Sequence, residues 1–177
     1  MTVRGTVLLA GLLAALLAYL WLGELRPRHD RARAKTVPTL LAAAPADVIR
    51  IDLEERGRRL VAVRRDGKWV DAQGHPWRGE AVGDLLDTLG TLSPIMVVDT
   101  DPAEPSDYGL GPDTPRLRVM AAQGKELLSL EIGERNPAWT GLYARLAGQR
   151  EVILVGAVLH WELEKLRDAA PEEDEKS

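Results

Sequence analysis

The sequence predicts an α+β fold, in which one N-terminal transmembrane helix precedes an antiparallel-sheet domain built from two strands-then-helix units. Three observations lead to this prediction. Residues 5–23 contain no charged side chain. Further along, short apolar stretches are separated by Gly-containing turns, as in hairpins. Each group of such stretches is followed by a segment whose leucines recur at helical spacing.

The uncharged stretch 5–23 predicts the membrane-spanning helix. Its 19 residues, each rising 1.5 Å, would span about 28 Å, close to the hydrocarbon thickness of a bilayer. Tyr19 and Trp21 lie near its end, where amphipathic rings favour the lipid headgroups. Gly11 belongs to a small-residue face that would let another helix approach, with plain helix filler as the alternative interpretation. Gly11, Tyr19 and Trp21 are therefore candidate partner contacts.

This helix is predicted to remain as an uncleaved signal anchor. Only Arg4 precedes it as a charged side chain, and the apolar stretch exceeds the roughly 7–15 residues of a signal-peptide core. No small-x-small cleavage site follows it directly, because Ala32-Arg33-Ala34 lies too far downstream. The chain has no cysteine that could carry a lipoprotein anchor.

Charges on either side of the helix bear on its orientation. Arg4 precedes the helix, and a basic cluster follows it, which by the positive-inside rule would keep the domain in the cytoplasm. The short N-terminal tail favours the opposite orientation, so the residues alone leave both open. The basic cluster consists of Arg26, Arg28, Arg31, Arg33 and Lys35.

Composition limits the partners of the remaining chain. The protein has 27 acidic and 23 basic residues, a net charge of −4. Residues 1–35 hold six of the basic and two of the acidic residues, which leaves 25 acidic and 17 basic residues beyond them. A domain with this net charge of −8 is not expected to bind nucleic acid, whose phosphates need clustered Lys and Arg.

The chain divides into five predicted regions, and about 125 residues of it form one ordinary domain. The basic segment after the helix is predicted to be a stalk, and the acidic C-terminal residues a disordered tail. The regions are a short tail at 1–4, the transmembrane helix at 5–23, the stalk at 24–44, the α+β soluble domain at 45–169 and the acidic tail at 170–177.

The first strands-then-helix unit begins at residues 48–54, where apolar and polar residues alternate, and this pattern predicts a half-buried strand. Arg56-Gly57 and Asp66-Gly67 mark two turns, and Asp-Gly is a strong hairpin signal. Residues 79–92 carry Leu85, Leu86 and Leu89 on one helical face. The predicted elements are strands at 48–54, 60–64, 68–71 and 95–98 and a helix at 79–92.

The second unit runs a similar course, which suggests an internal duplication. Gln123-Gly124 and Gly148-Gln149 are its predicted turns. Leu159, Leu163 and Leu166 lie along one side of its helix. The predicted elements are strands at 117–120, 127–132, 142–146 and 152–155 and a helix at 157–169.

No motif in the chain predicts catalysis, a cofactor or a metal. The histidines, His29, His75 and His160, lack metal-ligand spacing, and no serine lies in Gly-x-Ser-x-Gly. Gly109-Leu110-Gly111 precedes Pro112, so it cannot open a phosphate-binding helix. An acidic loop lacks the ligand order of a calcium site and is predicted to be a solvated turn. Its residues are Asp99, Asp101, Glu104 and Asp107.

Three tryptophans outside the membrane segment receive individual predictions. Trp69 follows a hairpin turn and Trp161 lies on the last helix, so both are predicted to be core residues. Trp139 lies in the loop 136–141. There it is either a partner-binding anchor or a residue that pins the loop, and it is the fourth candidate partner contact.

A set of short motifs goes beyond general pattern. In this order, behind one N-terminal helix, they resemble the bacterial family called domain of unknown function 4340 (DUF4340), over about residues 36–168. Gly109 is expected to need unusual backbone angles, and Pro115 to begin a strand. The motifs are Asp66-Gly67-Lys68-Trp69, Asp107-Tyr108-Gly109-Leu110 with Pro115 and Leu117, Ile132-Gly133, Tyr143-Ala144-Arg145 and Val152-Ile153-Leu154-Val155.

The resemblance implies a location and a setting but no catalytic residues. Members of the family are anchored in the bacterial inner membrane with the domain outside, often beside or fused to auxiliary components of gliding-type ABC transporters. We therefore expect a non-enzymatic accessory or scaffold subunit of an envelope membrane complex, with a periplasmic domain. Its partners would be integral membrane proteins through the helix and envelope proteins through the domain.

Two other classes of function stay open. One is an extracytoplasmic ligand-binding module for a lipid or an envelope glycan, with a groove near Trp139. The other is an enzyme, which the absence of a nucleophile, metal set or cofactor loop disfavours.

Overall fold

The computed structural model describes residues 38–171. The predicted membrane helix with Gly11, Tyr19 and Trp21, the basic cluster and the acidic tail from residue 172 lie outside the described residues. Within 38–171, neither helix is long and apolar enough to cross a membrane.

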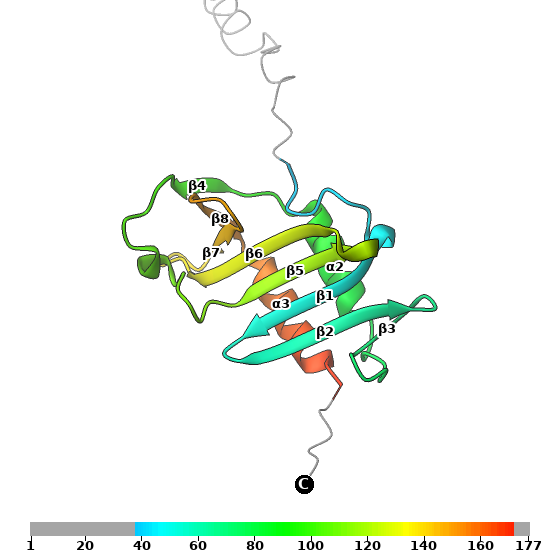
Figure 1. The fold of residues 1–177 in the computed structure, drawn as a ribbon. Coiled ribbons are helices and arrows are strands. Elements are labelled where there is room, and N and C mark those ends of the chain that lie inside the picture. The colour runs from blue at the N-terminus through cyan, green and yellow to red at the C-terminus, as the bar shows by residue number, and fades with distance from the viewer. Residues whose placement is uncertain (1–37, 172–177) are drawn as a thin grey trace, which may run out of the picture. The chain divides into compact units, whose positions relative to one another are not determined.

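The described chain is an α+β domain with an eight-stranded antiparallel sheet and two α-helices (Figure 1). The strand order across the sheet is β3-β2-β1-β5-β6-β7-β8-β4. This confirms the predicted class and the antiparallel sheet. The strands are β1 (Val48–Glu55), β2 (Arg58–Arg65), β3 (Lys68–Val70), β4 (Met96–Asp99), β5 (Arg116–Ala121), β6 (Glu126–Arg135), β7 (Gly141–Leu146) and β8 (Val152–Gly156), and the helices are α2 (Ala81–Thr91), α3 (Val158–Ala169) and the short 3-10 turns η2 (Pro45–Asp47), η3 (Pro105–Tyr108) and η4 (Ala122–Gly124).

Local sequence signals account for the order of these elements. β1, β2 and β3 precede α2, and β5 to β8 precede α3, with β4 between the two groups. Two-residue turns join β1 to β2 and β2 to β3. Arg56 and Gly57 have φ of 48° and 78°, and Asp66 and Gly67 have φ of 51° and 78°. Positive φ at both central positions is what a type I′ hairpin turn requires.

One continuous core lies between the helices and one face of the sheet. Figure 1 shows α2 and α3 side by side on the same face. The predicted leucine stripes of both helices are buried there, which confirms them, and they meet alternate residues of the strands. The helix side contributes Leu85, Leu86, Leu89, Leu159, Leu163 and Leu166, and the central strands contribute Ile51, Leu53, Leu117, Val119 and Leu130.

The end of the predicted stalk belongs to the domain. Leu40 and Leu41 are buried in the core, with exposures of 7% and 1%. Their amides donate to the carbonyl oxygens of Leu92 and Leu89, at 2.8 and 3.0 Å. The stalk boundary at residue 44 is therefore too late, and the compact unit begins at Pro38. The reason is that a short Leu-Leu pair can fill a gap beside α2 without being part of any helix or strand.

The tryptophans are distributed differently from the prediction. Trp161 is 57% exposed, so its assignment to the core is wrong. It lies two residues from both Leu159 and Leu163, and a two-residue step on a helix points to the opposite side. Trp69 is partly buried against the core. Trp77, for which no role was predicted, is the buried one at 8% exposure, and its Nε1–H donates to the Val61 carbonyl at 3.2 Å.

Gly109 confirms the expectation of unusual backbone angles. Its φ is 70°, in the left-handed region, and it ends the η3 turn. A Cβ on Gly109 would lie 2.7 Å from the backbone nitrogen of Glu134 in β6. The turn therefore presses directly on the sheet, and only glycine provides both the conformation and the space.

Candidate functional site

Trp139 belongs to an exposed cation–aromatic cluster whose central member is Arg135. Trp139 is 70% exposed, and the guanidinium carbon of Arg135 is 5.1 Å from the centroid of its ring. The same guanidinium lies 5.5 Å from the centroid of Trp161. One cation thus contacts two exposed indoles, one from the β6–β7 loop and one from α3. We call Arg135, Trp139 and Trp161 the Trp–Arg cluster.

The loop that carries Trp139 is fixed by Asn136. The Asn136 Oδ1 accepts hydrogen bonds from the amides of Thr140 and Gly141, at 2.9 and 3.0 Å. Its Nδ2 donates to the Thr140 hydroxyl, and its carbonyl accepts from the Trp139 amide. The loop is therefore pinned by Asn136, and the Trp139 ring is left at the surface.

Trp139 itself adopts a left-handed conformation, with φ of 59°. This conformation is uncommon for a residue with a bulky side chain and costs about 1–3 kcal/mol. Strain of this kind persists only where the surrounding structure imposes it, here through Asn136. It is the feature of the loop that points most directly to function.

Arg135 also acts on the neighbouring imidazole. His160 packs edge to face on Trp161, with 5.4 Å between ring centroids. Burial, and next the positive charge of Arg135, lower the pKa of His160, while Glu164 opposes this. The guanidinium is therefore the permanent cation of the cluster.

The sequence pointed to Trp139 but missed its two neighbours. Trp161 could have been found from the helical period, since it falls opposite the buried leucines of α3. No local pattern predicts the role of Arg135, because its contact with Trp161 joins β6 to α3, which are far apart in the chain.

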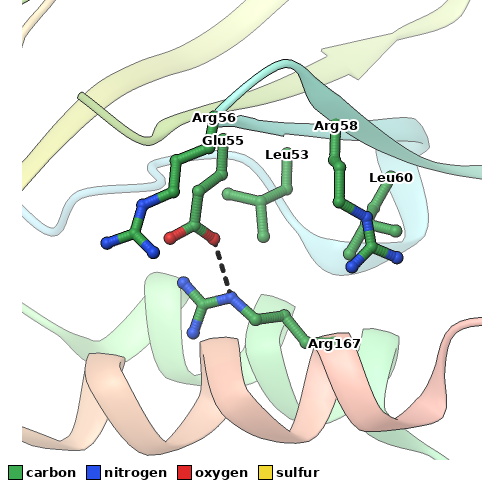
Figure 2. Close-up of a pocket in the computed structure, with 6 residues that line it drawn as sticks. All are labelled: Leu53, Glu55, Arg56, Arg58, Leu60 and Arg167. Carbon is green, nitrogen blue, oxygen red and sulfur yellow. Dashed lines mark hydrogen bonds and ion pairs between the residues drawn. The ribbon is translucent and has the colours of Figure 1, made fainter. Parts of the chain in front are cut away.

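A cavity of about 390 Å³ lies under the β1–β2 hairpin, beside the last turn of α3 (Figure 2). Its apolar floor is Leu53 and Leu60, and three arginines and one glutamate surround it. Arg167 pairs with Glu55 at 2.9 Å, whereas the guanidinium groups of Arg56 and Arg58 have no hydrogen-bond or ion-pair partner among the described residues. We call this the hairpin cavity.

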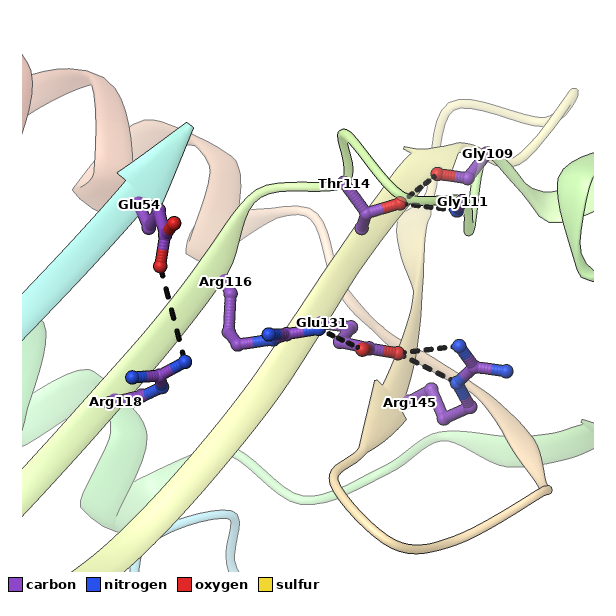
Figure 3. Close-up of polar contacts among 8 residues, drawn as sticks. All are labelled: Glu54, Gly109, Gly111, Thr114, Arg116, Arg118, Glu131 and Arg145. Atoms are coloured by element: carbon purple, nitrogen blue, oxygen red, sulfur yellow. Dashed lines mark hydrogen bonds and ion pairs between the residues drawn. The ribbon is translucent and has the colours of Figure 1, made fainter. Parts of the chain in front are cut away.

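The sheet face opposite the helices carries a row of alternating charges. Directly paired residues on five neighbouring strands run Arg59, Glu54, Arg116, Glu131, Arg145. Glu131 accepts from Arg116 and from Arg145, both at 2.7 Å (Figure 3). Opposite charges in directly paired cross-strand positions stabilise a sheet, so we assign this row a structural role.

Glu131 gives this face a defined pH response. Burial raises its pKa, but the hydrogen bonds from Arg116 and Arg145 outweigh burial, so the pKa lies below its ordinary value of 4.5. The unfolded chain therefore takes up the proton first. The stability that Glu131 contributes is complete above pH 4.5 and is lost as the pH falls through the lower, folded-state pKa.

We expect Glu131→Gln to lower the free energy of unfolding by about 1–2 kcal/mol at pH 7, because two guanidinium groups lose a charged partner. Urea unfolding measured from pH 7 downward checks this. Because the variant has no carboxyl to protonate at residue 131, the difference from the parent should shrink below pH 4.5. A difference that stayed constant with pH would contradict the role given to the carboxylate.

The predicted acidic loop is built from ordinary side-chain contacts. Asp99 accepts from the Tyr108 hydroxyl at 3.0 Å, and this bond is the main cause of a raised Tyr108 pKa. Asp101 pairs with Arg150 at 3.1 Å. Over residues 38–171, no group of three or more His, Cys, Asp or Glu side chains is arranged to hold a metal ion.

A comparison with protein families adds one finding. The model of a family described as Domain of unknown function (DUF4340) matches residues 68–172, which confirms the resemblance drawn from the motifs. The Trp–Arg cluster lies inside the matched region, while the β1–β2 hairpin lies before it. No curated protein and no solved structure matched the chain.

Proposed function

The chain belongs to the DUF4340 family, and because the function of that family is unknown, we propose a function from the residues of this chain. The protein is a non-enzymatic accessory or scaffold subunit of a bacterial envelope complex, and family association points to an ABC-type transport system as that complex. Residues 5–23 anchor it in the inner membrane, and its domain faces the periplasm. An envelope protein docks on the Trp–Arg cluster.

The observation that carries this proposal is the exposed, strained Trp139. Tryptophan and arginine are the residues most enriched among those that dominate binding energy at protein interfaces. Trp139 and Trp161 are 70% and 57% exposed and are held by a pinned loop and a helix, so they offer apolar area with little conformational entropy left to lose. A cation between them adds a polar contact that can select the partner.

The alternative function, an extracytoplasmic ligand-binding module, draws support from a different place. From the sequence, the ligand groove was predicted near Trp139. In the structure, the residues that suit a small ligand instead line the hairpin cavity. A module of that kind and an accessory subunit do not exclude each other, since the two surfaces belong to different elements.

A single introduced cysteine can test both the location and the partner, because the chain has none of its own. Ala138→Cys places a thiol beside Trp139 at an exposed position. A membrane-impermeant maleimide that carries a photo-crosslinker should label it in spheroplasts without lysis. On illumination it should crosslink the chain to an envelope or integral membrane protein, which mass spectrometry identifies.

Trp139→Gly in the Ala138→Cys background should abolish the crosslink and leave the labelling intact. Glycine tolerates the left-handed backbone without strain, so the free energy of unfolding should stay the same or rise. The matched control is Ala72→Cys, an exposed alanine on another loop, which should label without crosslinking. Labelling only after lysis would place the domain in the cytoplasm, and crosslinking that ignores Trp139 would refute this docking surface.

A further inference from the structure

The turn between β1 and β2 has Arg56 at a position whose backbone conformation disfavours arginine. Type I′ turns prefer Asn, Asp or Gly at the first central position. The β2–β3 turn follows this rule with Asp66, whereas the β1–β2 turn has Arg56 at the same position and nearly the same φ, 48° against 51°. The chain therefore keeps a guanidinium at a place where it costs stability.

The Arg56 side chain leads into the hairpin cavity. In Figure 2, Arg56 and Arg58 extend from the hairpin toward α3 with Leu53 between them. Leu53 is 2% exposed and belongs to the core, so the floor of the cavity is apolar. Two unpartnered cations above an apolar floor are complementary to an anion that carries an apolar group.

The negatively charged groups near the cavity already have partners. The Glu55 carboxylate, which would repel an anion, is bound by Arg167 at 2.9 Å. The carbonyls at the C-terminal end of α3 would also repel it. The Arg78 side chain donates to two of them, Asp168 and Ala170, at 2.8 and 3.3 Å. What remains unmatched around the cavity is the positive charge of Arg56 and Arg58.

We infer that the hairpin cavity binds a small amphiphilic oxyanion, a phosphate or carboxylate with a short apolar chain. Arg56 and Arg58 bind its oxygens, and Leu53 and Leu60 contact its chain. The volume of about 390 Å³ lies within the range of about 300–1,000 Å³ typical of small-molecule sites. The inference does not depend on the docking of a partner at the Trp–Arg cluster, which involves other residues.

Titration calorimetry of the full chain in a neutral maltoside detergent tests the site with hexyl phosphate as the probe. Inorganic phosphate lacks the chain and hexanol lacks the charge. Each should bind at least roughly tenfold more weakly than hexyl phosphate, since each forgoes one of the two kinds of contact. Added salt should weaken the binding of hexyl phosphate, because the arginines are partly open to solvent.

Arg56→Asn separates binding from folding. Asparagine is preferred in the left-handed conformation, so the melting temperature should stay the same or rise. The affinity for hexyl phosphate should fall by roughly tenfold, the loss of one charge-assisted hydrogen bond. If Arg56 served only the turn, Arg56→Asn would bind hexyl phosphate as tightly as the parent protein.

Arg65→Gln is the matched control, because it removes one exposed arginine beside the other hairpin turn and leaves the cavity intact. It should bind hexyl phosphate like the parent. The inference is overturned if Arg56→Asn binds as tightly as the parent, if Arg65→Gln loses as much affinity, or if inorganic phosphate binds as well as hexyl phosphate. Binding to vesicles of anionic lipid without binding of monomeric hexyl phosphate would also overturn it.

Discussion

Gly109→Ala is expected to lower the free energy of unfolding by about 2–4 kcal/mol. Two effects add. The φ of 70° is unfavourable for alanine, and the new methyl group would lie 2.7 Å from the Glu134 backbone nitrogen. A backbone atom cannot move aside as a flexible side-chain end can, so either the η3 turn or β6 must shift. Urea unfolding followed by tryptophan fluorescence measures the loss.

Gly148→Ala is the control that separates these effects. Gly148 has φ of 78°, but nothing lies within 4 Å of its would-be Cβ. This variant should lose only the conformational part, about 1 kcal/mol. Equal losses at Gly109 and Gly148 would show that the contact with β6 contributes nothing.

Trp77→Ala is expected to be the most destabilising of the tryptophan substitutions, at about 3–5 kcal/mol. Trp77 is 8% exposed and packs in the core, and the loss of its Nε1–H leaves the Val61 carbonyl without that donor. Trp77→Phe keeps most of the apolar contact and should cost less, with the missing hydrogen bond contributing about 1 kcal/mol.

Trp139→Ala provides the comparison at the surface. With 70% of the side chain already in water, the expected change is within about 0.5 kcal/mol. Trp69 is partly buried, so the stability lost in Trp69→Ala should lie between the losses in Trp77→Ala and Trp139→Ala. Thermal unfolding of these three variants and of Trp77→Phe measures the order. A loss in Trp139→Ala as large as that in Trp77→Ala would contradict the exposed position of Trp139.

Local signals in the sequence predicted much of this fold. Asp66-Gly67 has the backbone that a two-residue hairpin needs, and Ile51 and Leu53 of the alternating stretch 48–54 are buried in the core. The leucines of α2 and α3 are buried as their spacing predicts. Each of these features depends on residues a few positions apart, where sequence and conformation are directly coupled.

Features that depend on distant contacts could not be predicted in the same way. The alternating charges of Arg116, Glu131 and Arg145 align only once the register of β5, β6 and β7 is fixed. Arg167 and Glu55 are 112 positions apart, yet they form one ion pair. The burial of Leu40 likewise depends on the gap that α2 and its neighbours leave, which no local pattern describes.

The way in which Leu40 and Leu41 enter the domain determines how it responds to mechanical load. Tension on the chain ahead of Pro38 first meets two backbone hydrogen bonds to the Leu89 and Leu92 carbonyls and two buried leucine side chains. The load therefore passes first into the C-terminal end of α2 and into the core around these two leucines. Only after these contacts give way does the force act on Val48, where β1 begins. For a domain tethered at its N-terminus, this attachment takes up force before the β1–β2 hairpin does.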